Sequence, residues 1–432
     1  MSRKQIMLFV LASLLFQGAI AQDKLSIDLN EAKQHALQFN KNIQNSALSV
    51  QLSQEQLKQT IAAGLPQVDA TADYNNALGA EISIQFAEGQ PASQIPIDPT
   101  SSFNLTVGQL IFSANYWVGV QTAKLYQKLS EKSQTKTERD VLSQVVESYY
   151  LVLVSGETLE ILQGNVKNLQ AIYDKTAPLV EFGMTEKVEL DQLSVQLNSL
   201  KNAVKSAERQ HLMAENMLRL QLGVEADTEL ELTEELDGLL ADDPFEQSLM
   251  EGFELTENID YQLMTAQGEV QEKQVDMQKA NYLPTLSSYY SFNHKILKPA
   301  FDMAPTHMVG LQMNIPIFSS GERRAKVRAA KIDLETYRNE QALLEDQLAI
   351  QYKQLSFNLK SALENFKNQQ TNIEVSREVY QNLKQKYEQG MISSLELTSA
   401  DNNYLKAESD YLQAALELLQ AQNQLNTLTG KL

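Results

Sequence analysis

The 432-residue chain contains no cysteine. Disulfide bridges, thiolate metal ligands, iron–sulfur clusters and cysteine nucleophiles are therefore excluded, and so is a lipid anchor on an N-terminal cysteine. Histidine is almost as scarce, and its spacing forms no metal-ligand motif. The four histidines are His35, His211, His294 and His307. Without a nucleophile–base pair or a metal constellation, we expect no enzyme, no metal and no cofactor.

Basic residues are also few compared with acidic ones. The chain has 36 Lys and Arg against 55 Asp and Glu, a net charge of −19. So acidic a surface repels phosphate backbones, which excludes nucleic acid as a partner. Residues 220–272 hold sixteen acidic residues and no Lys, Arg or His. We expect this segment to present a solvated acidic face, because it contains no calcium-loop motif.

Long hydrophobic runs are absent after the first 21 residues. Residues 1–21 combine Arg3 and Lys4, an apolar stretch from Ile6 to Phe16 and an Ala-Ile-Ala site. This pattern predicts a cleaved signal peptide, with an uncleaved N-terminal anchor as the alternative. The apolar stretch is too short for a spanning helix, so we expect an exported protein without a transmembrane helix. The lack of long hydrophobic runs does not exclude a transmembrane β-barrel, because barrel strands are only weakly hydrophobic overall.

The chain repeats itself with an offset of 207 residues. Gly183 corresponds to Gly390 and Gly223 to Gly430, and a Leu-Pro pair opens a polar/apolar alternating stretch in each half. Such self-similarity predicts two copies of one unit. The first repeat covers 22–222, with helices at about 30–63, 114–181 and 185–222 and strands at about 66–86 and 101–112. An acidic equatorial linker covers 223–257. The second repeat covers 258–432, with helices at about 258–281, 321–388 and 393–429 and strands at about 284–297 and 307–318.

The long helical segments carry a coiled-coil pattern. Apolar residues alternate steps of three and four from Leu397 to Leu428, and the same positions recur at the repeat offset in the first half. This spacing predicts long antiparallel hairpins of paired helices that reverse at Gly183 and Gly390. His211 falls in the first seam, where we expect an interhelical hydrogen bond and no metal ligation.

The strand segments alternate between polar and apolar residues. In 67–75, for example, Val68, Ala70, Ala72 and Tyr74 alternate with polar side chains. The pattern fits barrel strands, and it also fits a half-buried sheet in a soluble domain. The predicted leader favours a barrel. Four strands cannot close one, since about eight are needed, so three chains with twelve strands are the simplest closure.

The double helix–strand–strand–helix–helix plan, the Leu-Pro strand starts and the two glycine tips resemble the TolC-type outer-membrane efflux channels. The resemblance extends from about Leu25 to Gly430. It implies an α+β membrane protein in which a coiled-coil α-helical barrel is continuous with a trimeric transmembrane β-barrel in the outer-membrane lipid. The resemblance implies a passive homotrimeric exit duct for small molecules, with a periplasmic adaptor protein and an inner-membrane transporter as partners. Alternatives are a type I protein-secretion duct, a metal-export duct or an exported coiled-coil scaffold without a pore.

The resemblance also assigns roles to residues near the two tips. An acidic ring at the pore entrance would use Glu396, but its second position is Ser399, so we expect a weaker ring. In some members a base pairs with the acid at Glu189, and Ile392 stands where that base would be, so we expect no such acid–base pair. The positions implied for the tips and adaptor docking are Gly183, Met184, Thr185, Glu189, Tyr387, Gly390, Met391 and Ile392.

Overall fold

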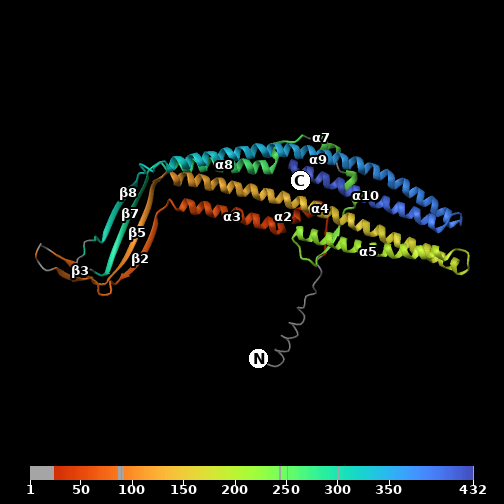
Figure 1. Ribbon diagram of the computed structural model, residues 1–432, viewed down its shortest axis with the longest axis horizontal. Coiled ribbons are helices and arrows are strands. Elements are labelled where there is room, and N and C mark those ends of the chain that lie inside the picture. Colours follow the sequence, from red (N-terminus) through yellow and green to blue (C-terminus); the bar gives the residue numbers. More distant parts are fainter. Residues whose placement is uncertain are drawn as a thin grey trace, which may run out of the picture. The chain divides into compact units, whose positions relative to one another are not determined.

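The computed structural model describes residues 24–85, 89, 92–242, 245–250, 252–298, 302 and 304–431. The predicted signal peptide, 1–21, lies outside the described residues. The described chain divides into two compact units. The first consists of 24–46, 135–259 and 346–431, and the second of 47–134 and 260–345. Figure 1 labels the elements of both units.

The first unit is mainly helical. Two helices, α4 (Ala114–Glu181) and α9 (Glu322–Glu388), begin in the second unit and end in the first. Every helix in the described part of the chain is too short or too polar to cross a membrane. The other elements of this unit are β1 (Lys24–Ile27), α2 (Leu29–Phe39), the start of α3 (Lys41–Ala62), α5 (Lys187–Leu222), β6 (Glu229–Leu232), α6 (Leu236–Asp242), α7 (Phe245–Met250), the 3-10 helix η1 (Leu255–Glu257) and α10 (Ser394–Thr429).

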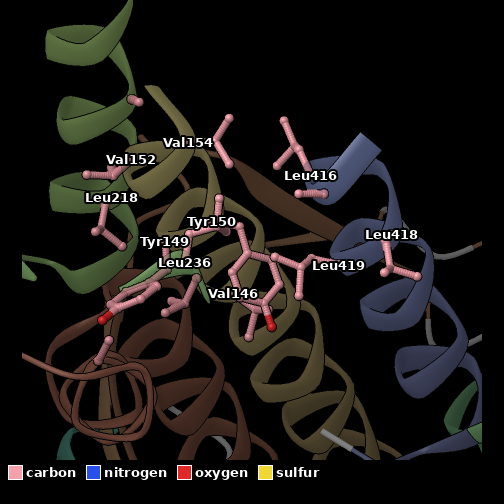
Figure 2. Close-up of a cluster of buried hydrophobic side chains, with 14 of the residues drawn as sticks. Val146, Tyr149, Tyr150, Val152, Val154, Leu218, Leu236, Leu416, Leu418 and Leu419 are labelled. Atoms are coloured by element: carbon pink, nitrogen blue, oxygen red, sulfur yellow. The ribbon is translucent and has the colours of Figure 1, made fainter. Parts of the chain in front are cut away.

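A core of apolar side chains joins these elements. Tyr149 of α4, Leu218 of α5 and Leu419 of α10 are completely buried and lie in one cluster (Figure 2). Val145 of α4 is also completely buried. Burial of a side chain of this size contributes roughly 1.5–3 kcal/mol to stability. The predicted seam packs inward as expected, because alternating steps of three and four keep its residues on one helix face.

The four glycines that mark the repeat end their helices in the same way. All have φ between 70° and 80°, a conformation that glycine adopts without a steric cost: Gly183, Gly223, Gly390 and Gly430. After the first tip glycine, the Met184 N–H donates to the Leu179 carbonyl at 2.8 Å, and Met391 donates to Lys386 at 2.9 Å. This bond from the residue after the glycine to a carbonyl five residues earlier is the Schellman cap. The two repeats therefore share the same backbone geometry at their helix ends.

The predicted helix at 30–63 is two helices, α2 and α3. Asn40 between them has ψ 129°, and its side chain accepts from the Asn42 N–H at 2.8 Å. The Asn40 amide donates to the Gln221 carbonyl at 2.7 Å. Asn258 makes the equivalent bond to the Leu428 carbonyl at 2.9 Å. The break thus satisfies a carbonyl at the end of α5 that the helix itself leaves unpaired.

The predicted linker at 223–257 also contributes to the core. Strand β6 pairs in parallel with β1, from Lys24 opposite Glu229 to Ile27 opposite Leu232. Leu236 and Phe245 are buried. The acidic residues of β6 stay exposed because they alternate with the leucines that pack inward.

The second unit contains a four-stranded antiparallel sheet in the order β2-β5-β7-β8. Its long strands are β2 (Gln67–Asn75), β5 (Thr100–Ser113), β7 (Thr285–Leu297) and β8 (His307–Asn314). A separate hairpin joins β3 (Glu81–Ile84) to β4 (Ser93–Pro96), and α8 (Ile259–Ala280) precedes β7.

Two predicted strand boundaries were wrong. The strand expected at 66–86 ends at Asn75, where a turn with Leu78 and Gly79 at positive φ leads into β3. The strand expected at 307–318 ends at Asn314. Pro316 lacks the N–H that a continuing strand would need.

Candidate functional site

The sheet of the second unit has two chemically different faces. Val68 of β2 lies beside Val107 of β5, which lies beside Tyr290 of β7 and then Val309 of β8. This apolar face remains open: Val309 is 79% exposed. The opposite face carries polar residues in register, including Asp73, whose carboxylate accepts from the Ser102 hydroxyl at 2.8 Å. A sheet with one exposed apolar face and one polar face is suited to separate lipid from water.

The tips of the two helical hairpins present methionine side chains to solvent. Met184 is 75% exposed and Met391 is 68% exposed. Each follows a tip glycine in a Schellman cap, so the cap geometry fixes where the methionine leaves the helix. The tips therefore offer a matched pair of flexible apolar side chains, a residue type that suits protein contacts.

Glu189 links the two tips. Its Oε1 atom accepts from the Ser394 N–H at 3.1 Å and also from the Ser394 hydroxyl. Ser393, one residue earlier, caps α10 by accepting from the Glu396 N–H at 3.3 Å. Ile392, at the position where a base was considered, carries no charge. The carboxylate nevertheless joins the tips through Ser394, which the sequence did not predict.

A cleft of about 420 Å³ lies between the tips. Tyr387 and Thr176 approach across it, with their hydroxyl oxygens 3.4 Å apart. The lining includes five residues assigned from the sequence: Thr185, Glu189, Tyr387, Gly390 and Ile392. Gly183, Met184 and Met391 lie outside the lining. Glu396 and Ser399 also lie outside it and are exposed. Because they are three residues apart on α10, they share one helix face.

Asp401 is the acidic residue near the tips that the sequence reasoning missed. Its side chain is only 3% exposed, beside the apolar cluster that contains Leu397, Ala400 and Tyr380. Its Oδ1 atom has no hydrogen-bond partner among the described residues. Burial is the main cause that raises the pKa of Asp401 to about 6; the Tyr380 hydroxyl bond opposes this shift. Its position next to Ala400, a residue of the predicted coiled-coil pattern, could have indicated that Asp401 is buried.

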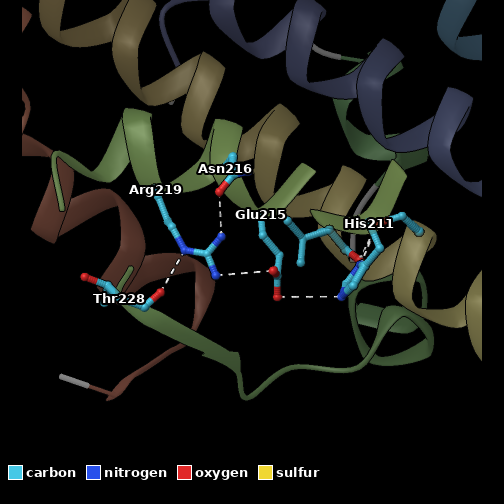
Figure 3. A network of polar contacts seen from close by, with 7 residues as sticks. His211, Glu215, Asn216, Arg219 and Thr228 are labelled. Atoms are coloured by element: carbon cyan, nitrogen blue, oxygen red, sulfur yellow. Dashed lines mark hydrogen bonds and ion pairs between the residues drawn. The ribbon is translucent and has the colours of Figure 1, made fainter. Parts of the chain in front are cut away.

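The interhelical hydrogen bond predicted for His211 is confirmed. Its Nδ1 atom lies 2.9 Å from the Ser155 hydroxyl of α4. Its Nε2 atom is 3.7 Å from Glu215, which also pairs with Arg219 at 3.2 Å, and the Arg219 Nε donates to the Thr228 carbonyl (Figure 3). The histidine is therefore part of a polar network between helices. The described residues hold no cluster of three or more His, Asp or Glu side chains suited to a metal ion.

Removal of the Glu189 carboxylate should loosen the joint between the tips. We expect Glu189→Ala to lower the protection of the Ser394 amide against hydrogen exchange by a factor of about ten, because a hydrogen bond to a charged group is worth about 1.5 kcal/mol. Glu186→Ala is the matched control, since the Glu186 side chain on the same tip makes no cap bond. Equal protection in both variants would show that Glu189 does not join the tips.

Comparison with known proteins agrees with this geometry. The model of the family described as "Outer membrane efflux protein" matches residues 32–224 and 254–431. No curated protein sequence matches the chain. The structure is similar to that of the Campylobacter jejuni CmeC outer membrane channel, with 17% identity, a TM-score of 0.74 and coverage of 96% of this chain and 91% of that one.

Two further solved structures show the same fold. One is the open state of the Neisseria gonorrhoeae MtrE outer membrane channel, with 15% identity and a TM-score of 0.72. The match covers 93% of this chain and 88% of that one. The other is the outer membrane protein VceC from Vibrio cholerae, with 12% identity, a TM-score of 0.72 and coverage of 93% and 96%. The family match covers most of the chain, and the chain therefore belongs to the outer membrane efflux protein family, whose members are passive outer-membrane efflux channels and not enzymes.

Proposed function

We propose that the protein is the exit duct of a tripartite efflux pump, a passive homotrimeric channel that carries small molecules across the periplasm and the outer membrane. A periplasmic adaptor protein and an inner-membrane transporter would be its partners, and the transporter would supply the energy. The observation that carries the proposal is the sheet with one exposed apolar face, one polar face and an open strand at each edge.

The sheet needs further strands to complete it. β2 pairs only with β5, and β8 only with β7, among the described strands. Unpaired backbone groups cannot face lipid, so a membrane-spanning sheet of this kind has to close on itself. Three copies give twelve strands, a number that leaves a water-filled lumen. The polar face with Asp73, Asn104 and Thr106 would line that lumen.

Aromatic residues flank the apolar face. Tyr74 and Phe103 lie toward one end of the strands and Phe112 toward the other, and all three are exposed. Girdles of aromatic side chains mark both membrane–water interfaces of transmembrane β-barrels. Their positions support an outer-membrane lipid contact along this face.

The tips are the proposed docking site for the adaptor. Met184 and Met391 supply exposed apolar contacts, and the cleft that contains Thr185, Tyr387 and Ile392 lies between them. Gly183 and Gly390 position these contacts through their positive φ angles. Glu396, with Ser399 beside it, is the proposed acidic residue of the pore entrance, and Glu189 holds the two tips together.

Single-channel conductance in planar bilayers tests this function. We expect particles of three chains that conduct in discrete steps and prefer cations. Glu396→Lys should reverse or abolish the preference, because three copies replace a ring of three negative charges by three positive ones. Ser399→Ala is the control and should leave the preference unchanged. If Glu396→Lys leaves the cation preference unchanged, Glu396 does not lie at the pore entrance. If the protein never inserts into the bilayer, the proposed channel function is wrong.

A further inference from the structure

The start of α9 is strongly basic. Residues 322–331 hold five basic side chains and one acidic side chain, although the chain as a whole has a net charge of −19. Arg324, Arg328 and Lys331 follow one another at steps of four and three, so they lie on one face of the helix. All three are exposed, and none has an ion-pair partner among the described residues. This basic stripe (Arg324, Arg328 and Lys331) is therefore available to an anion from outside the chain.

Apolar side chains lead from the sheet to the basic stripe. Between the end of β8 and the start of α9, Ile317 is 91% exposed and Phe318 is 84% exposed. At the rise of an α-helix, Arg324 lies about 3 Å along α9 and Arg328 about 9 Å. The headgroup layer on each side of a bilayer is about 5–8 Å thick. The stripe therefore begins where the headgroups begin, if the apolar face of the sheet lies in the hydrocarbon core.

The direction of α9 aims the stripe back toward the sheet. The helix runs away from β8, and the Cα–Cβ bonds of a helix tilt toward its N-terminus, which is the sheet end of α9. Arg and Lys side chains extend further along apolar surface until the charged group reaches a polar layer. Even Lys331, about 14 Å along the helix, can therefore bring its ammonium group close to the headgroups.

The handedness of the backbone decides on which side of the sheet the stripe lies. Asn293 of β7 pairs with Asn104 on the polar face, and its N–H donates to the Thr306 carbonyl, on the β8 side, at 2.8 Å. In a strand of L-residues that runs upward with a side chain toward the viewer, the N–H of that residue points to the right. Seen from the polar face with the helices below, β8 therefore lies to the right of β7.

The helices that continue these strands keep the same order. α9 packs beside α8 and the residues that follow it, through Tyr337 on the Met264 carbonyl and through Arg323 over the Tyr282 ring. Arg324 follows Arg323 by one residue, which is a rotation of about 100°. Because the helix is right-handed, this rotation leads from the α8 side toward the side of the apolar face. The stripe and the apolar face thus lie on the same side of the second unit.

The other repeat marks the same level with an aromatic residue. The repeat offset relates Arg324 to Trp117, the single tryptophan of the chain, near the start of α4. Trp117 is 59% exposed. Tryptophan is enriched where a membrane meets water. Its position therefore supports a headgroup layer at the height of Arg324, independently of the charges.

From these observations we infer that Arg324, Arg328 and Lys331 bind the phosphate groups of anionic phospholipids at the membrane–water interface beside α9. The inference rests on the proposed channel and names the class of lipid that its helical end selects. The binding is electrostatic, because an exposed basic residue near an anionic membrane surface attracts it within a Debye length. The chain as a whole is acidic and repels such a surface, so the stripe would fix which part of the chain meets the headgroups.

The lipid that stays bound to the channel tests this inference. The full-length protein is reconstituted in equal amounts of phosphatidylglycerol and phosphatidylcholine and extracted in mild detergent, and the retained lipids are quantified by mass spectrometry. We expect the wild type to retain more phosphatidylglycerol than phosphatidylcholine. Arg324→Gln with Arg328→Gln should lower that ratio about twentyfold, since each basic residue is worth about fivefold. Arg324→Lys with Arg328→Lys keeps both charges and should keep the preference. Inorganic phosphate, added as a competitor, should not abolish it.

Lys353→Gln with Lys360→Gln is the matched control. It removes the same charge from exposed positions of the same helix, about 44 and 54 Å further along than Arg324. The control should leave the lipid ratio unchanged. An equal loss in both double variants would show that the preference follows net charge, and the stripe would not be the binding site.

The remaining outcomes separate the lipid site from the channel. A wild type that inserts and conducts but retains both lipids equally would contradict the lipid site and leave the channel intact. If Arg324→Gln with Arg328→Gln keeps the lipid ratio but loses binding to purified cell-wall sacculi, the stripe binds the cell wall and the inference is wrong. A protein that never inserts would contradict the proposed function itself.

Discussion

Asp401→Asn is expected to stabilise the helical tips at pH 7 and to leave their stability unchanged at pH 4. The pKa of Asp401 in the folded chain is about 6, against 3.8 for the free side chain. The folded state therefore keeps a proton that the unfolded state loses, and stability falls as the pH rises from about 4 to about 6. A shift of about two units corresponds to at most about 3 kcal/mol, which asparagine would recover.

Unfolding followed by hydrogen exchange across α9 and α10 at the two pH values measures this effect. Asp410→Asn is the control on the same helix, because Asp410 is 44% exposed and pairs with Lys406 at its surface. It should change stability by well under about 1 kcal/mol at either pH. A destabilised Asp401→Asn at pH 7 would show that the buried carboxylate is a favourable partner of Tyr380.

Gly223→Ala should destabilise the first unit by about 3 kcal/mol or more. An added Cβ would lie 2.3 Å from the Phe39 carbonyl oxygen, and the backbone of α2 cannot move aside without losing the bond from Asn40 to Gln221. The strain of positive φ adds about 1 kcal/mol. Gly183→Ala separates the two causes, because it has φ 70° and nothing within 4 Å of the added atom.

Chemical denaturation of the two variants measures the difference. Gly183→Ala should cost about 1 kcal/mol from backbone conformation alone. Equal costs in both variants would mean that α2 moves aside easily at the end of α5. The steric clash between the added Cβ and Phe39 would then add nothing to the cost of the substitution.

The sequence was most informative where one local rule decides the structure. A glycine after a long periodic run predicts a helix end, and Gly183 and Gly390 have this geometry because other residues reach positive φ only at a cost. The seam from Leu397 to Leu428 could be predicted for a similar reason, since its spacing admits one buried face.

Tertiary contacts decided what the sequence did not predict. Asn40 breaks a helix because the end of α5 needs a hydrogen-bond donor, and nothing near Asn40 in sequence indicates this. Asp401 is buried beside Tyr380 of α9, a contact that the periodic pattern of α10 does not indicate, because Asp401 stands one residue outside the predicted buried positions. Glu189 bonds to Ser394 partly through a backbone N–H, which every residue except proline possesses and no motif can reveal.

The unpaired edge strands of the sheet make an unassembled chain prone to aggregation. β2 and β8 each present a row of backbone donors and acceptors that any other extended chain could pair with. For the proposed homotrimer, correct assembly of the copies competes with aggregation, and both accelerate as the concentration of unassembled chains rises. The rate of synthesis then matters as much as final stability. Slow expression and periplasmic chaperones that cover strand edges should raise the yield of mature channels, even though neither changes the free energy of the finished particle.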